Sequence, residues 1–250
     1  MQLTHPNITL TCTESDIYES LLVLDDASIL ELGCGKADHT GRIAQRHQTA
    51  TIIAAEVDRV QLGENLAAAV PENISFTDFG AESIPLPDAS QDLVLMFRSL
   101  HHVPLPRLDD AMREILRVLK PGGYAYISEP VFAGPLNEMI RIFNDEEAVR
   151  TAAFDTMCRA VETGMFELAN ETFFLVPVIY KDFAEFDRKH FQVTHSERNV
   201  SDAQRLAVER LFNTHLSPDG VKLAQQIRVD LLRKPLLSSR YPGTSDTVNK

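Results

Sequence analysis

A glycine pair flanked by acidic residues is the segment of this sequence best suited to bind a small ligand. Residues 29–37 read ILELGCGKA, so Gly33 and Gly35 directly follow a short apolar run. Glycine lets the backbone approach a ligand closely, and a helix starting after the loop would present free N–H groups to it. Glu31 and Asp38 would repel a phosphate, whereas Glu31 would attract an ammonium group. The loop therefore predicts a ligand with a cationic amine and no phosphate.

A second acidic residue, Glu56, is placed to contact a nucleoside. Glu56 follows the apolar run at 51–55, which reads as a second buried strand, 25 residues after Glu31. An acid at that strand end is well placed to accept hydrogen bonds from both hydroxyls of a ribose. An amine at one end and a ribose at the other describe S-adenosylmethionine. A dinucleotide is disfavoured, because its fingerprint has glycine where this chain has Asp38.

The elements that must position these residues alternate between strands and helices in the first half of the chain. Apolar runs indicate strands, and apolar residues spaced by three and four indicate helices. This alternation predicts a parallel sheet with helices on both faces. Strands are expected at 28–32, 51–55, 74–76, 92–97 and 124–128, and helices at 16–24, 40–47, 60–69 and 108–119.

The second half departs from that alternation. Residues 132–168 have helical spacing and directly follow the fifth strand, so a helical cap over the ligand crevice is expected within an insertion at 131–171. We divide the single domain into a cofactor-binding core at 16–130, this cap, a part at 172–235 that completes the sheet, and a frayed tail at 236–250. A helical pair within 201–225 is interpreted as either a dimer surface or a decoration of the fold. Expected elements are an extended segment at 172–180, helices at 182–189, 201–212 and 217–225, and strands at 191–194 and 227–232.

Four segments occur in a characteristic order: LELGCG at 30–35, IPLPD at 84–88 with DLV at 92–94, LHHV at 100–103, and RVLKPGG at 117–123. Together they resemble the class I S-adenosylmethionine-dependent methyltransferases, most of all the broad group that contains the quinone-biosynthesis methyltransferases. The resemblance covers about half of the chain. It implies an α/β, doubly wound, Rossmann-like and mostly parallel seven-stranded sheet. It also implies methyl transfer from S-adenosylmethionine, giving S-adenosylhomocysteine, to a small organic acceptor through O, C or N.

The resemblance also implies a role for individual residues in holding the cofactor. Glu31 would hold the methionine amine, Glu56 the ribose hydroxyls and Val57 the adenine. The family commonly has aspartate at the position of Gly80, beside the large Phe79, so recognition of the adenine amine would pass to Asp78 or Glu82. The full set of expected cofactor contacts is Glu31, Gly33, Cys34, Gly35, Glu56, Val57, Gly80, Ala81 and Phe97.

Candidate catalytic residues follow the fourth and fifth strands. His101 and His102 offer one general base, since imidazole is neutral near pH 7; the alternative is a packing role for the pair, whose side chains are expected to point apart. Arg98 is interpreted as an anchor for an acidic acceptor or as the partner of Glu129, which lines the crevice. Tyr18 is interpreted as either a lid or a core residue. These three residues are the substrate-binding candidates. His190 and His195 have no ligand spacing, and no metal site is expected.

Composition excludes several other functions. Lys and Arg total 24 against 36 Asp and Glu, a net charge of −12, which argues against binding to nucleic acid or to an anionic membrane surface. The sequence has neither an apolar stretch of eighteen residues nor a signal-peptide pattern. Three separated cysteines suit a reducing, cytoplasmic environment. Two alternatives stay open: an inactive cofactor- or partner-binding module with this fold, motivated by Gly80, and a protein methyltransferase.

Overall fold

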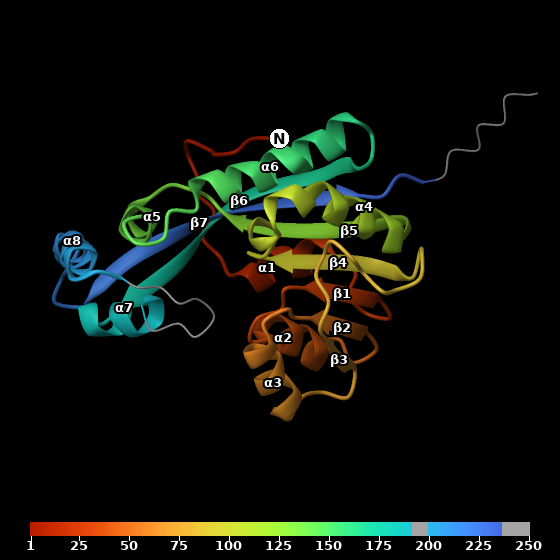
Figure 1. Cartoon of the computed structure of the whole chain (residues 1–250), viewed down its shortest axis with the longest axis horizontal. Helices are drawn as coiled ribbons and strands as arrows, with labels where there is room; N and C mark the ends of the chain where they lie inside the picture. The colour runs from red at the N-terminus through yellow and green to blue at the C-terminus, as the bar shows by residue number, and fades with distance from the viewer. Residues whose placement is uncertain (192–199, 237–250) are drawn as a thin grey trace, which may run out of the picture.

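A computed structural model of the chain describes residues 1–191 and 200–236. Seven strands form one sheet in the order β3-β2-β1-β4-β5-β7-β6 (Figure 1). The first five strands are mutually parallel, whereas β7 runs antiparallel to both β5 and β6, so the sheet is mixed. The strands are β1 Ser28–Leu32, β2 Thr51–Ala55, β3 Ile74–Thr77, β4 Gln91–Phe97, β5 Leu119–Pro130, β6 Glu167–Tyr180 and β7 Val221–Arg233.

Helices cover both faces of this sheet, as the continuous apolar strands predict. Along β4, Val94 and Met96 belong to a core shared with α4 and α6, whereas Leu93 and Leu95 belong to a core shared with α1 and α2. No helix within the described residues is long and apolar enough to cross a membrane. The helices are α1 Glu14–Leu21, α2 Asp38–Arg46, α3 Arg59–Ala67, α4 Leu108–Val118, α5 Pro135–Ile140, α6 Glu147–Glu162, α7 Phe183–His190 and α8 Asp202–Asn213, with the 3-10 turns η1 Leu100–His102 and η2 Leu105–Arg107.

The segment after β5 does not confirm the expected cap. Its main helix, α6, lies on the sheet beside α4, and Phe154 and Met157 are buried in the core of that face. The following strand begins at Glu167, earlier than the extended segment expected at 172–180. Burial of the apolar face of α6 against the sheet stabilises this position, because exposing two such side chains would cost about 3–6 kcal/mol. Only the start of α6 reaches the edge where β4 ends.

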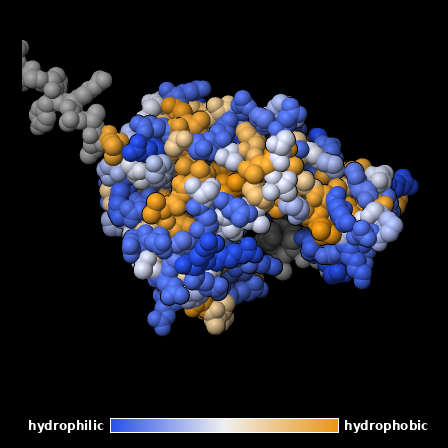
Figure 2. All heavy atoms as spheres, turned by 180° about the vertical axis from the view of Figure 1, so that it is seen from behind, coloured by the Kyte–Doolittle hydropathy of each residue, from blue (hydrophilic) through white to orange (hydrophobic). Residues whose placement is uncertain are grey.

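A smaller lobe surrounds the ends of β6 and β7 that extend beyond β5 (Figure 1). It consists of α5, α7 and α8, and Figure 2 shows from behind that the surface is hollowed between this lobe and the rest of the molecule. The lobe has its own apolar core, which consists of Leu136, Met139, Tyr180, Phe186, Val208, Phe212 and Val221.

The helix expected at 217–225 is wrong. Ser217 and Gly220 form a tight turn with mutual backbone hydrogen bonds of 3.1 and 3.0 Å, and β7 starts at Val221, opposite Tyr180 of β6. Pairing along β6 satisfies the backbone of 221–226, and this tertiary gain overrides the local helical spacing. The single helix α8 replaces the expected helical pair. Of the strand expected at 191–194, residues 192–194 lie outside the described residues, as does His195.

Candidate functional site

The glycine loop connects β1 to α2 and lies directly under the end of β4. Gly33 has a φ of +69°, and a Cβ placed on it would lie 2.7 Å from Cβ of Ser99. The amides of Gly33 and Cys34 both donate to the carbonyl of Ala55, at 2.9 and 3.0 Å. Ser99 Oγ donates to the carbonyl of Leu32 at 2.7 Å. Glycine suits position 33 for two reasons: the backbone conformation disfavours a side chain, and the approach of Ser99 leaves no room for one.

Glu56 directly follows β2, where the sequence places it, and its side chain holds the glycine loop. Its Oε2 accepts a hydrogen bond of 2.7 Å from the amide of Gly35, and its Oε1 accepts one of 2.8 Å from the amide of Asp58. Asn65 of α3 donates to the carbonyl of Gly35 at 2.7 Å. A Cβ on Gly35 would meet no atom within 4 Å. The loop is therefore held from the Glu56 side and open on another, which suits a cradle for a ligand.

Glu31 is a buried carboxyl with one described hydrogen-bond donor. It is 2% exposed, and Thr40 Oγ1 donates to its Oε2 at 2.6 Å. Burial raises the pKa of Glu31 to about 8. A carboxylate in this position gains most from a cationic partner, because an opposite charge offsets the cost of burying its own. The donor set fits an ammonium group here, as the methionine part of S-adenosylmethionine would provide.

The carboxylate of Glu82 lies beside Gly80, where the family commonly has an aspartate. A Cβ on Gly80 would lie 2.4 Å from Oε2 of Glu82, so the Glu82 carboxylate occupies the space of the missing side chain. Phe79 packs against the main core. Val57 is 63% exposed, and Ala81 is buried. Of the two acids expected to replace the family's aspartate, the structure brings Glu82 to this position.

The end of β4 carries an aromatic cluster that includes a histidine missed by the sequence analysis. Phe97 stacks on His39 of α2 with ring centroids 4.3 Å apart, and Tyr18 meets Phe97 edge-on at 5.8 Å. Tyr18 is 1% exposed, which supports its core interpretation. Burial lowers the pKa of His39 to about 4, helped by the cations of Arg98 and Arg42. His39 therefore stays neutral, and its place in the first turn after the glycine loop is the signal that could have found it.

Arg98 pairs with Glu14, so the interpretation that Glu129 balances it is wrong. Its Nη2 lies 3.9 Å from Oε2 of Glu14, whose other oxygen accepts a hydrogen bond of 2.7 Å from the hydroxyl of Tyr126. Arg98 has a φ of +56°, an unusual conformation for a side-chain-bearing residue. Its amide donates to the carbonyl of Ser128 at 2.7 Å. The pairing reaches across 84 positions of the sequence, which spacing cannot indicate.

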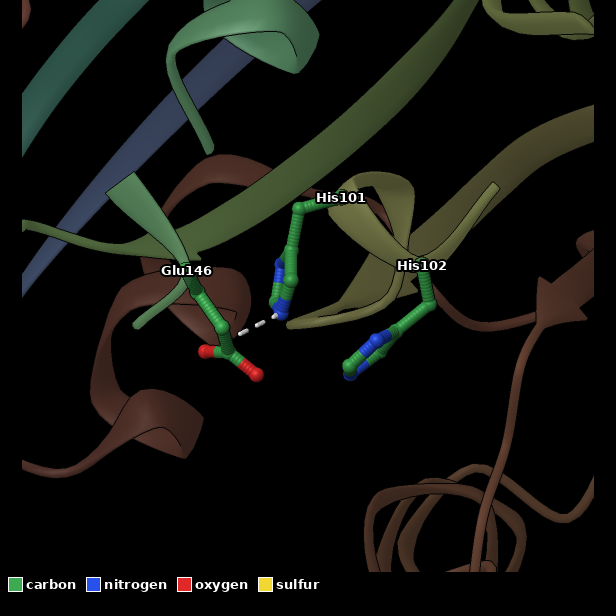
Figure 3. Close-up of side chains that lie close together, drawn as sticks. All are labelled: His101, His102 and Glu146. Atoms are coloured by element: carbon green, nitrogen blue, oxygen red, sulfur yellow. Dashed lines mark ion pairs between the residues drawn. The ribbon is translucent and has the colours of Figure 1, made fainter. Parts of the chain in front are cut away.

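Glu129 instead holds His101. Its Oε2 is hydrogen-bonded to Nδ1 of His101, and its Oε1 accepts from the amide of Leu100 at 2.9 Å. The His101 side chain is 3% exposed, and its Nε2 lies 3.9 Å from Oε2 of Glu146, just before α6. The His101 and His102 rings lie side by side, with centroids 4.1 Å apart, so the expectation that they point apart is wrong (Figure 3). The tight 3-10 turn η1 brings them together.

These groups meet because they follow parallel strands. The carboxyl ends of β1, β2, β4 and β5 lie at one edge of the sheet, where an open α/β fold binds its ligands. Glu31 and Glu56 stand at the first two strand ends, and His101 and Glu129 at the last two. The edge therefore combines a place for a cationic nucleoside with a carboxylate-oriented imidazole, which together suit proton removal next to a bound cofactor.

The first half of the chain is similar in sequence to known methyltransferases. Residues 29–123 match the family described as "Methyltransferase domain". The chain is 32% identical over 127 residues to methyltransferase GfsG of Streptomyces halstedii, covering 49% of this chain and 45% of GfsG. It is 32% identical over 119 residues to the ubiquinone/menaquinone biosynthesis C-methyltransferase UbiE of Hahella chejuensis, covering 46% of each.

The similarity of the fold extends further than that of the sequence. The chain matches under half the length of these two relatives. The crystal structure of the YcgJ protein from Bacillus subtilis superposes with a TM-score of 0.63 over 88% of this chain and 97% of that chain, at 16% identity. The second half of this chain thus shares the fold of that protein, including the part that the sequence match leaves out.

Proposed function

We propose that this chain is a class I S-adenosylmethionine-dependent methyltransferase and that it transfers a methyl group from S-adenosylmethionine to a small organic acceptor. The observation that carries the proposal is the shared edge at which Glu31, Glu56 and the His101–Glu129 pair meet. Bound S-adenosylmethionine supplies a methyl group activated on a sulfonium. The remaining task of the protein is to hold both reactants and to accept a proton.

Three acids hold the cofactor in this proposal. Glu31 binds the amine of its methionine part, because a buried carboxylate with a single donor favours a cation. Glu56 accepts the ribose hydroxyls at the end of β2. Glu82 accepts the adenine amine from the position beside Gly80, with Val57 against the ring. The glycines of the loop leave room for the methionine part, since Gly35 is open beyond its Cα.

His101 is the general base of this proposal, and Glu129 is its positioning residue. Glu129 accepts a hydrogen bond from Nδ1 of His101, so the lone pair of this imidazole lies on Nε2. Nε2 takes the proton of the acceptor when that acceptor is a phenol, an alcohol or a carbon acid. Oε2 of Glu146 lies 3.9 Å from Nε2 of His101, which is too far for a hydrogen bond. In this proposal the acceptor therefore approaches Nε2 beside the carboxylate of Glu146.

The surroundings of Glu129 favour a small acceptor. A cavity of about 150 Å³ adjoins Glu129 and is lined in part by Phe132, Arg150 and Arg228. Both guanidinium groups are already paired with acids of the chain, Arg150 with Glu146 at 2.6 Å and Arg228 with Asp230 at 2.7 Å, so the size of the cavity and its aromatic ring support a small, partly apolar acceptor. Arg98, the anchor suggested by the sequence, is likewise paired, with Glu14 at 3.9 Å. The net charge of −12 further favours a small molecule over a nucleic acid.

Calorimetric titration with S-adenosylmethionine and with S-adenosylhomocysteine tests the cofactor site. We expect both to bind the full chain, and Glu56→Ala to weaken both by about tenfold or more, as loss of a charged hydrogen-bond acceptor predicts. Glu72→Ala removes the same charge from an exposed acid and should leave both affinities unchanged. Failure of the folded protein to bind either compound would reject the proposal.

An acceptor screen with small carboxylic acids and phenols tests the chemistry. For an acceptor that must lose a proton, His101→Asn should lower kcat by about 10²–10⁴-fold, the usual contribution of a general base, while the affinity for S-adenosylhomocysteine stays the same. If Glu129 positions His101, Glu129→Gln should flatten the pH profile of kcat. If Glu129 only packs, the shape of that profile should stay the same. Tight cofactor binding with no turnover across the screen would instead support the inactive-module alternative.

A further inference from the structure

Three side chains of metal-ligand type converge beside the end of β4. A ring nitrogen of each of His101 and His102 and a carboxylate oxygen of Glu146 lie within 4.8 Å of one another. Figure 3 shows the two imidazoles and the carboxylate directed toward the same space. Nε2 of His101 lies 3.9 Å from Oε2 of Glu146. One ion can bridge such a pair, because Zn²⁺ binds nitrogen and oxygen at about 2.0–2.2 Å.

The neighbouring residues orient two of these ligands. Glu129 accepts a hydrogen bond from Nδ1–H of His101, and this bond directs Nε2 toward the cluster. Metal-binding histidines are commonly oriented by a hydrogen bond of this kind. Asn144 donates to Oε1 of Glu146 at 2.7 Å, and Arg150 donates to Oε2 at 2.6 Å. A carboxylate has about four lone-pair positions, so these bonds fix Glu146 and leave it able to bind an ion.

We propose that His101, His102 and Glu146 bind a divalent transition-metal ion of the Zn²⁺ class. Two imidazoles and a carboxylate are ligands that Zn²⁺ prefers, whereas Mg²⁺ and Ca²⁺ prefer sites made of oxygen alone. Three protein ligands also leave a fourth position for water or for another small ligand. Sequence spacing does not indicate this site, because Glu146 stands 45 positions after His101.

The ion and the proposed base function exclude each other. A bound Zn²⁺ occupies the Nε2 lone pair of His101, the same lone pair that takes the proton of the acceptor in the proposed methyl transfer. A bound ion should therefore inhibit methyl transfer. The inhibition rests on the proposed function, whereas binding of the ion is independent of it and can be measured without an acceptor.

Titration of the full chain with Zn²⁺, with the partly exposed Cys12 and Cys158 first blocked by an alkylating reagent, tests the binding. We expect one strong site per chain. We expect at least about tenfold weaker binding in His102→Ala and in Glu146→Gln, because even residues that only support a metal ligand cost 10–100-fold in affinity. His5→Ala removes an exposed histidine outside the cluster and serves as the matched control. A visible absorption spectrum with Co²⁺ then reports nitrogen and oxygen coordination.

Equal Zn²⁺ affinity of the wild type and His102→Ala would overturn the proposal, as would a wild type with no strong site. An unchanged midpoint of urea unfolding in His102→Ala shows that the variant is folded, so its loss of Zn²⁺ binding supports the site. Once an acceptor is known, Zn²⁺ should inhibit the wild type at concentrations that leave His102→Ala active. Failure of methyl transfer itself would remove only this last comparison and leave the binding result decisive.

Discussion

The hydroxyl of Thr40, in the first turn of α2, donates a hydrogen bond of 2.6 Å to the buried carboxyl of Glu31 at the end of β1. This contact links the strand before the glycine loop to the helix after it. It also lowers the pKa of Glu31, but burial outweighs it and raises the pKa to about 8. Glu31 is therefore mostly protonated at neutral pH until a cation approaches.

This protonation predicts a pH-dependent affinity for S-adenosylhomocysteine. The amine of the ligand favours the carboxylate form, so binding at pH 7 should release about one proton from Glu31. The affinity should then rise by about tenfold per pH unit from pH 6 to 7 and level off above pH 8. Calorimetry in buffers of different ionisation enthalpy measures the released proton. Glu31→Gln should bind more weakly and lose this pH dependence; a flat wild-type profile would contradict the assignment.

Gly33→Ala should destabilise the protein for two separate reasons. The backbone φ of +69° disfavours alanine, and the new Cβ would lie 2.7 Å from Cβ of Ser99. We expect the free energy of unfolding, measured in urea, to fall by about 1–3 kcal/mol. Gly35→Ala has a similar φ, +52°, but meets no atom within 4 Å, so it should lose only the conformational part. Equal losses in the two variants would show that the Ser99 contact is unimportant.

Glu82→Ala should weaken the binding of S-adenosylhomocysteine by about tenfold to a hundredfold, the range for a hydrogen bond to a charged group. The reason is that its carboxylate occupies the position next to Gly80 where an acid would meet the adenine amine. Adding Gly80→Asp to this variant should restore part of the affinity, since removal of Glu82 clears space for the new side chain. Calorimetry compares the three proteins, and Glu72→Ala is again the control. An unchanged affinity of Glu82→Ala would reject this role.

Arg228 and Asp230 form a buried ion pair. Breaking this pair should cost folding stability, and the size of that cost should depend on pH. Their side chains are 4% and 0% exposed, and Nε of Arg228 lies 2.7 Å from Oδ2 of Asp230. Burial raises the pKa of Asp230 to about 6 despite the neighbouring guanidinium. Arg228→Met leaves this carboxylate buried without its partner, which should cost about 3–5 kcal/mol at pH 8.

The sign of the pH effect follows from the raised pKa. Without Arg228 the pKa of Asp230 rises further, so at pH 5 the carboxyl binds a proton and buries no charge. The stability deficit of Arg228→Met relative to the wild type should therefore be smaller at pH 5 than at pH 8, as measured by urea unfolding at both values. The double variant Arg228→Met/Asp230→Asn should lose most of this difference. A deficit that is equal at both pH values would show that Asp230 does not titrate in this range.

The sequence by itself determined the parallel half of the sheet and the edge that carries the proposed cofactor residues. Apolar runs and glycine breaks are local signals, and Glu31 and Glu56 must lie close together once parallel strands end at one edge. The position of the glycine loop follows from the same signals, because Gly33 and Gly35 directly follow the apolar run of the first strand. Periodicity likewise predicted α4, which ends at Val118, one residue before the Lys-Pro-Gly-Gly segment at 120–123.

Only the tertiary structure decided which side chains act together. His101 meets Glu129 and Glu146, and Arg98 meets Glu14, across separations that spacing cannot encode. The strand at 221–226 and the position of α6 on the sheet were also decided by packing, because long-range strand pairing and burial of apolar surface outweigh local helical preference. Local spacing sets the period of each element, whereas the contacts that assemble a site depend on which elements pack together.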